Sequence, residues 1–147
     1  MEIAVLACGC FWGPEIKFSK LEGIYRTEVG YCGGNSSKTS YEEVCTGNTN
    51  HAEVVKLEFD PNKISYEKIL EFFFQIHDPT TLNSQGPDFG TQYRSEIFYL
   101  NDNQKNIAEK ITKKINEKLL GKVVTKISLL KNYCVAEEYH QKYLDKN

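Results

Sequence analysis

The sequence predicts an α+β fold, a two-layer sandwich with a mixed central sheet and a ferredoxin-like core with additions. Residues 2–8 form an almost uninterrupted apolar run, which is typical of a strand covered on both faces. Residues 52–59 show the two-residue period of a strand, and residues 103–120 repeat apolar side chains at helical spacing. Because 147 residues fit one ordinary domain, we expect residues 1–147 to fold as a single unit.

The first half of the chain alternates strands with short helices. The strand over residues 2–8 is expected to be central in the sheet. Residues 13–23 predict a short helix, because a Gly-Pro pair opens the segment and a glycine ends it. A strand over residues 24–31 follows and closes in a Gly-Gly-Asn turn. The capping box at residues 40–43 then predicts a short helix near Cys45.

The second half continues the same alternation. In the strand over residues 52–59, Glu53 falls on the same face as the apolar Val55, Leu57 and Phe59. The remaining elements are a helix capped by Ser65 and running to about Ile76, a long loop from Asp78 through Gln92, a strand over residues 94–100, a helix over residues 103–120, a strand over residues 123–130 and a final helix over residues 135–144.

Composition and charge exclude several classes of function. Apolar residues make up 40% of the chain, which is enough for a packed core. The net charge of -2 lacks the basic surplus that phosphate contacts require, so we expect no nucleic-acid partner. The longest apolar stretches fall far below the roughly 20 residues of a membrane span, and no leader precedes the first strand, so we expect no membrane association. The cysteines are odd in number (Cys 5) and spread widely, which suits a reducing compartment, so we expect a cytoplasmic protein.

Cys10 is the first candidate for chemistry. It lies between a buried strand and the start of a helix, where unpaired backbone N–H groups and the helix dipole favour a thiolate and therefore a nucleophile. Phe11 and Trp12 follow it, bracketed by Gly9 and Gly13, which puts two large rings beside the sulfur. The alternative is that Cys10 is only a small buried hydrophobic residue.

Glu53 is the second candidate, because an acid that faces inward must be neutralised, paired or used. Desolvation raises the pKa of a carboxyl group, and a protonated Glu53 can serve as a general acid. The alternative is that Glu53 reaches water at the end of its strand. Tyr41 and Tyr93 can supply uncharged hydroxyl donors. His51 has no second His or Cys at ligand spacing, so we expect no metal site.

Conspicuous segments are spread in order over nearly the whole chain. They are Gly9-Cys10-Phe11-Trp12-Gly13, Gly30-Tyr31 with Gly33-Gly34, Tyr41-Glu42-Glu43-Val44-Cys45, His51-Ala52-Glu53, His77-Asp78-Pro79-Thr80-Thr81, Gln85-Gly86-Pro87-Asp88, Gly90-Thr91-Gln92-Tyr93-Arg94-Ser95 and Ala136-Glu137-Glu138-Tyr139-His140-Gln141-Lys142-Tyr143-Leu144. The series resembles the A-type peptide methionine sulfoxide reductases, the MsrA family. Residues 1–147 are therefore expected to form a single catalytic domain of this type.

The resemblance implies an oxidoreductase that reduces the S epimer of methionine sulfoxide, free or in peptides and proteins. Cys10 would attack the sulfoxide sulfur and become a sulfenic acid. Glu53 would deliver a proton to the sulfoxide oxygen, and Tyr41 and Tyr93 would hold that oxygen by hydrogen bonds. The chemistry needs such groups, because sulfoxide oxygen is a poor leaving group until it is protonated or hydrogen-bonded.

The same resemblance implies a substrate pocket. Phe11 and Trp12 would enclose the methyl group of the substrate, and Asp88 would anchor the substrate or its loop. No metal or other cofactor is implied, but an external thiol reductant is required. We expect the enzyme to be a monomer.

Regeneration of Cys10 is the step at which the sequence departs from the family pattern. Many relatives carry resolving cysteines in a tail beyond the last motif, and none is found here before the chain ends at Asn147. Cys134 is the best internal candidate. Either Cys134 forms a disulfide with Cys10 that thioredoxin reduces, or an external thiol such as glutathione with glutaredoxin resolves Cys10 directly, which we slightly prefer. The remaining cysteines, Cys8, Cys32 and Cys45, are expected to pack or line turns.

Two other classes of function compete with this interpretation. A thiol peroxidase or disulfide oxidoreductase also uses a low-pKa cysteine at a helix N-terminus, but the chain has no Cys-x-x-Cys motif to support it. A small α+β binding domain whose cysteines merely pack would show no sulfoxide reduction that depends on Cys10.

Overall fold

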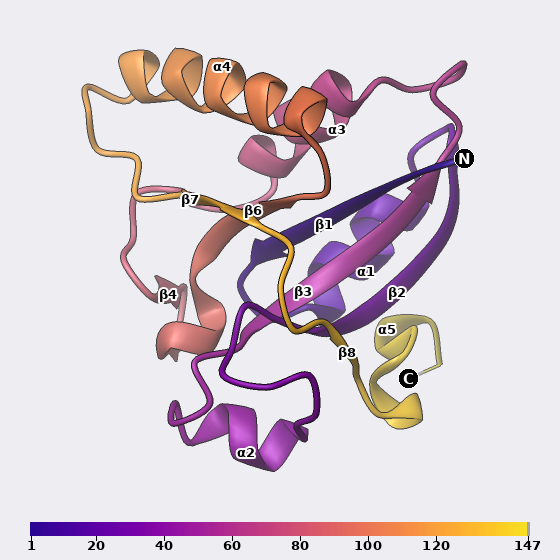
Figure 1. Ribbon diagram of the computed structural model, residues 1–147, viewed down its shortest axis with the longest axis vertical. Helices are drawn as coiled ribbons and strands as arrows, with labels where there is room; N and C mark the ends of the chain where they lie inside the picture. Colours follow the sequence, from indigo (N-terminus) through magenta and orange to yellow (C-terminus); the bar gives the residue numbers. More distant parts are fainter. Residues whose placement is uncertain (147) are drawn as a thin grey trace.

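The computed structural model describes residues 1–146, and its main feature within them is a six-stranded sheet (Figure 1). Its strands lie in the order β7 (Lys126–Leu129), β6 (Ser95–Tyr99), β1 (Glu2–Cys8), β3 (Ala52–Phe59), β2 (Ile24–Cys32) and β8 (Cys134–Val135). The β6–β7 pair is parallel and the other neighbours are antiparallel, which confirms the mixed sheet. β1 lies inside the sheet, as its apolar run predicts.

Helices pack against one face of this sheet. They are α1 (Trp12–Ser19), α3 (Tyr66–Gln75) and α4 (Asp102–Lys118), while the shorter α2 (Tyr41–Cys45) and α5 (Tyr143–Lys146) lie near the lower end in Figure 1. The predicted cap is confirmed at Ser65, whose side chain accepts a hydrogen bond from the backbone N–H of Lys68 at 3.1 Å. Along the chain the elements run β1-α1-β2-β3-α3-β6, with α2 between β2 and β3 and further short elements between α3 and β6. The ferredoxin-like core stays a prediction.

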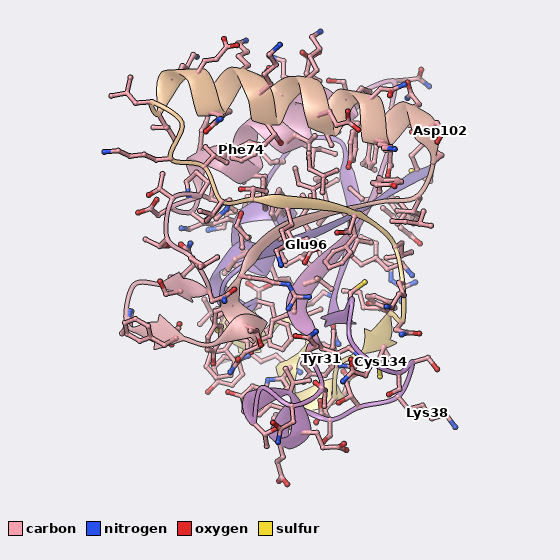
Figure 2. All side chains as sticks on the ribbon, turned by 60° about the vertical axis from the view of Figure 1, so that its left-hand side comes forward. Tyr31, Lys38, Phe74, Glu96, Asp102 and Cys134 are labelled. Atoms are coloured by element: carbon pink, nitrogen blue, oxygen red, sulfur yellow. The ribbon has the colours of Figure 1, made fainter. Side chains whose placement is uncertain are left out.

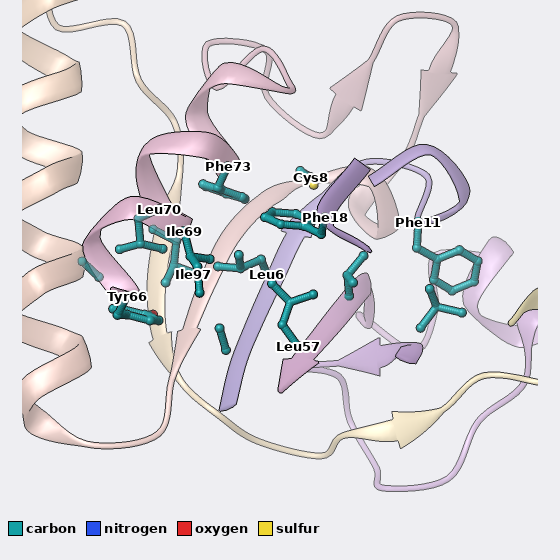
Figure 3. Packing of buried hydrophobic residues seen from close by; sticks show 14 of the residues in the cluster. Leu6, Cys8, Phe11, Phe18, Leu57, Tyr66, Ile69, Leu70, Phe73 and Ile97 are labelled. Carbon is teal, nitrogen blue, oxygen red and sulfur yellow. The ribbon is translucent and has the colours of Figure 1, made fainter. Parts of the chain in front are cut away.

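Apolar side chains are buried on both faces of the sheet. On the helical face the cluster includes Leu6, Phe18, Leu57, Ile69, Phe73 and Ile97 (Figure 3). On the other face a smaller cluster includes Val5, Ala7, Val54 and Phe98, with Leu130 and Tyr133 from the segment between β7 and β8 packed against it. Successive residues of β1 therefore face different cores, which explains why the strand is apolar at nearly every position.

The final helix predicted over residues 135–144 is wrong. Cys134–Val135 pairs with β2 as β8, and a single 3-10 turn over Glu138–His140 precedes α5. Polar side chains fix this irregular path: the Gln141 amide accepts from the N–H of Val29 and donates to its carbonyl, both at 2.9 Å. Such long-range bonds replace the intrahelical ones, and apolar periodicity does not reveal them.

The long loop from Asp78 through Gln92 has structure of its own. β4 (Ser84–Gln85) and β5 (Asp88–Phe89) form a small hairpin, and a 3-10 turn over Thr91–Tyr93 follows. The last large strand is also shorter than the predicted 123–130. Within residues 1–146, no helix has the length and apolar character needed to cross a membrane.

Candidate active site

Cys10 lies in the turn between β1 and α1 and is half-buried. The turn depends on Gly9, whose φ of +96° is one that residues with a Cβ rarely adopt. A Cβ on Gly9 would also lie 2.8 Å from Cγ of Gln85. Glycine at this position therefore lets the β4–β5 hairpin close over the turn that carries the sulfur.

Glu53 lies near the start of β3 and is only 1% exposed, so the alternative in which it reaches water is wrong. Its Oε1 accepts a hydrogen bond from the backbone N–H of Phe11 at 3.2 Å, directly after Cys10 in the chain. Its Oε2 is buried and has no hydrogen-bond partner among the described residues. Burial raises the pKa of Glu53 to about 8, so the carboxyl group is mostly protonated at neutral pH.

The prediction of a Cys10 thiolate in the free protein is wrong. Burial raises the pKa of the Cys10 thiol to about 11 and outweighs the hydrogen bond from the backbone N–H of Trp12, which lowers it. Negative charge on Glu53 or Asp88 raises the pKa of Cys10 further. In the resting site at neutral pH, the thiol and the Glu53 carboxyl group therefore both carry protons.

Tyr41 and Tyr93 bring hydroxyl groups to the same site from two separate elements. Tyr41 is the first residue of α2, and Tyr93 ends the 3-10 turn that follows the hairpin. Burial, and then negative charge on Glu53, raise the pKa of Tyr93 to about 12. Burial and a hydrogen bond to the Cys45 side chain raise the pKa of Tyr41. Both tyrosines therefore offer neutral O–H donors.

Asp88 lies on β5 and is half-buried. Its charge acts on three of the groups above, because it raises the pKa values of Cys10, Glu53 and Tyr93. The hairpin thus brings a carboxylate to the site from a position far along the chain. Five residues singled out in the sequence consequently meet in space: Cys10, Tyr41, Glu53, Asp88 and Tyr93.

The two rings that follow Cys10 occupy different environments. Phe11 is only 1% exposed, and its ring centroid lies 5.7 Å from that of Tyr31 and 5.2 Å from that of His140. Figure 3 shows it at one end of the core, away from Ile69 and other α3 side chains. Trp12 is half-buried and stacks on Tyr143 with centroids 3.9 Å apart. Phe11 therefore belongs to the core behind the site, whereas Trp12 keeps exposed surface.

Sequence reasoning assigned no role to Glu137 and His140, which hold the site together. The Glu137 carboxylate accepts from the Tyr31 hydroxyl at 2.8 Å and from the N–H of Tyr41 at 3.0 Å. His140 is 1% exposed, and its Nδ1 accepts from the Trp12 indole N–H at 3.1 Å. Both residues lie in a motif that the sequence displays, but the predicted helix over 135–144 concealed the direction of their side chains.

All five cysteines of the chain, Cys10 included, are free. Cys8 and Cys32 are buried, and Cys45 is exposed at the end of α2, directly before a turn. Cys134 lies on β8 opposite Tyr31, next to which Figure 2 shows it. Its Sγ is 3.8 Å from the carbonyl oxygen of Thr39.

His51 is buried and held in place by contacts with its neighbours. It is 1% exposed, and its Nε2 is 2.7 Å from the carbonyl oxygen of Ser36. Its ring also fills the space where a Cβ on Gly34 would lie. Across residues 1–146, no group of three or more His, Cys, Asp or Glu side chains is arranged to hold a metal ion.

Known proteins resemble this chain over nearly its whole length. A family model described as "Peptide methionine sulfoxide reductase" matches residues 2–147. The "Peptide methionine sulfoxide reductase MsrA" of Pelagibacter ubique (strain HTCC1062) is 79% identical over 146 residues, which cover 99% of each chain. Among solved structures, Mxr1 from Saccharomyces cerevisiae in reduced form has a TM-score of 0.95 and 45% identity, covering 99% of this chain and 85% of that chain.

A second structure of the yeast protein, Mxr1 in complex with Trx2, has a TM-score of 0.69 and 29% identity, covering 97% of this chain and 84% of that chain. The family model and the relatives span the whole segment that carries the cysteine, the buried acid and the tyrosines. The chain belongs to the peptide methionine sulfoxide reductase A family.

Proposed function

We propose that this chain reduces the S epimer of methionine sulfoxide, free or within peptides and proteins, to methionine. The observation that carries the proposal is the buried Oε2 of Glu53, which has no partner among residues 1–146 and lies beside the Cys10 turn. A buried O–H without an acceptor costs free energy, so the site favours a ligand that accepts one hydrogen bond there. A sulfoxide oxygen is such an acceptor.

The reaction balances with these two groups alone. The Cys10 sulfur attacks the sulfoxide sulfur while Glu53 gives its proton to the oxygen, and Glu53 recovers a proton from the Cys10 thiol. The bond between the methionine sulfur and oxygen and the new bond between the two sulfur atoms then break, while a bond forms between the oxygen and the Cys10 sulfur. Oxygen ends on Cys10 as a sulfenic acid, the methionine sulfur gains an electron pair, and Cys10 is oxidised by the same two electrons.

The raised pKa of Cys10 fits this order of events. The sulfoxide sulfur is the positive end of the S–O dipole, so a bound substrate favours the thiolate that the empty site disfavours. The neutral form of Glu53 adds no negative charge beside that sulfur. The thiol is therefore activated by the substrate rather than kept reactive in its absence.

The remaining residues position the substrate. The hydroxyl groups of Tyr41 and Tyr93 hold the sulfoxide oxygen together with Glu53. Trp12, with Phe11 packed behind it, forms the apolar wall for the methyl group. Asp88 fixes the hairpin side of the pocket.

An external thiol completes the cycle. Thioredoxin is the reductant we propose, supported by the structure of yeast Mxr1 with Trx2, and glutathione with glutaredoxin is the alternative. No further cofactor is needed, because the electrons come from thiols. The five free cysteines support a reducing, cytoplasmic setting.

The proposal is tested with racemic methionine sulfoxide and a thiol reductant. We expect the unaltered chain to stop after consuming half of the sulfoxide, leaving the R epimer, and Cys10→Ser to form no methionine while its circular dichroism stays unchanged. Activity in the Cys10→Ser chain would refute the mechanism.

Glu53 is tested in the same assay. Glu53→Gln should lower kcat by about 100-fold to 10,000-fold with little change in KM, because the acid acts only in the transition state. Glu42→Gln, an exposed change on α2, is the matched control and should behave like the unaltered chain. An unchanged kcat in Glu53→Gln would contradict the acid role.

A further inference from the structure

Cys45 lies beside the proposed active site on α2. It is exposed and ends this helix, four residues after Tyr41, so the two side chains share one side of the helical turn. The Tyr41 hydroxyl and the Cys45 sulfur are hydrogen-bonded. An exposed sulfur is thus coupled to a tyrosine of the proposed active site.

Two contacts fix α2 to the rest of the site. The backbone N–H of Tyr41 donates a hydrogen bond to the Glu137 carboxylate, and the centroid of the Tyr41 ring lies 4.6 Å from that of the His140 ring. His140 in turn accepts the indole N–H of Trp12, two residues after Cys10. A continuous set of contacts therefore runs from the Cys10 turn to the helix that carries Cys45.

The charges of the two cysteines act on a common set of groups. Negative charge on Cys45 raises the pKa of Cys10 and, together with Cys10, the pKa of Tyr93. Partial shielding of its sulfur from water raises the pKa of Cys45 itself, and negative charge on Glu53 and Glu137 raises it further. Charge on Cys45 thus affects the nucleophile, and charge on the acid affects Cys45.

We propose that Cys45 is the resolving cysteine, which converts the oxidised Cys10 into an intramolecular disulfide. This inference rests on the function proposed above, which supplies the sulfenic acid. The Cys45 sulfur attacks the Cys10 sulfur, the S–O bond breaks, and the hydroxyl group leaves as water with the Cys45 thiol proton. The new disulfide lies at an exposed edge of the site, where an external dithiol reduces it back to two thiols.

The other cysteines are placed less well for this step. Cys8 and Cys32 are 5% and 0% exposed, and burial raises the pKa of Cys8 to about 12. Cys134 lies on β8, and β3 and β2 separate that strand from β1, which leads to Cys10. At about 4.8 Å per strand, this separation is roughly 14 Å, twice the Cα separation of about 7 Å that a disulfide tolerates.

A single turnover without reductant tests the proposal. The full chain is mixed with one equivalent of the S epimer of N-acetylmethionine sulfoxide, and methionine product, free thiols and intact mass are measured. We expect the unaltered chain to form product and lose two of its five free thiols, with a Cys10–Cys45 cross-linked peptide in the digest.

Cys45→Ser and Cys134→Ser form a matched pair of variants. Cys45→Ser should form product, lose only the Cys10 thiol and carry a sulfenic acid that dimedone labels. Its turnover with thioredoxin should fall by about tenfold or more. Cys134→Ser should form the same disulfide as the unaltered chain.

The outcomes separate the two proposals. Product formation with loss of two thiols in Cys45→Ser, or a cross-link that maps to Cys134, would overturn the resolving role of Cys45 alone. Absence of product in the unaltered chain would overturn the proposed function, and the resolving role with it.

Discussion

Replacing Glu53 by glutamine should change how folding stability depends on pH. Burial raises the pKa of Glu53 from 4.5 to about 8 in the folded chain, whereas the unfolded chain keeps the ordinary value. Between these values the unfolded state releases the proton and the folded state retains it. The free energy of unfolding therefore falls as pH rises from about 4.5 to 8, and it levels off above that range.

The size of the effect follows from the pKa difference. At about 1.4 kcal/mol per pH unit, the full shift corresponds to roughly 5 kcal/mol, of which about 4 kcal/mol is lost between pH 5 and pH 9. Glutamine cannot ionise, so Glu53→Gln removes this loss. Its buried amide N–H groups cost about 1–3 kcal/mol where they find no acceptor, but that cost is the same at every pH.

Urea unfolding of both chains from pH 5 to pH 9 measures the difference. Contributions from other titrating groups, such as the buried His77, are shared by the two chains and cancel in the subtraction. We expect Glu53→Gln to gain about 4 kcal/mol relative to the unaltered chain across this range. A difference that stays constant with pH would refute the conclusion that Glu53 is protonated in the neutral resting site.

Three further predictions concern the framework, each measured by urea unfolding. Arg94→Leu leaves the buried Glu96 carboxylate without the guanidinium 2.6 Å away and should lower the free energy of unfolding by about 3–5 kcal/mol. The double variant Arg94→Leu with Glu96→Leu should restore most of this loss. A loss below about 1 kcal/mol in the single variant would contradict the pairing. Phe18→Ala should cost about 3–5 kcal/mol, because the ring is 0% exposed, and a near-neutral change would contradict its place in the core. Gly9→Ala should cost about 1–3 kcal/mol and lower turnover, because the residue has φ +96° and the added methyl group meets Gln85; full activity would show that the hairpin is not fixed by this contact.

Glu53 and Cys10 show what local sequence can and cannot predict. The inward direction of Glu53 followed from the two-residue period of β3, because a strand fixes the faces of its residues whatever lies around them. The pKa of Cys10 did not follow from its place before α1. It depends on burial and on Asp88, which a hairpin brings from 78 positions along the chain. The path of the segment after β8 depends likewise on Glu137 and Gln141 bonding to distant backbone, a choice that no local pattern encodes.

His140 and Glu137 hold Trp12 and Tyr41 in place by hydrogen bonds, and this has a consequence for biosynthesis. Cys10 leaves the ribosome well before the groups that secure its surroundings, which are translated more than a hundred codons later. A nascent polypeptide therefore carries the sulfur before its pocket has formed. Reductase activity begins only when the segment after β8 has packed against the rest of the fold.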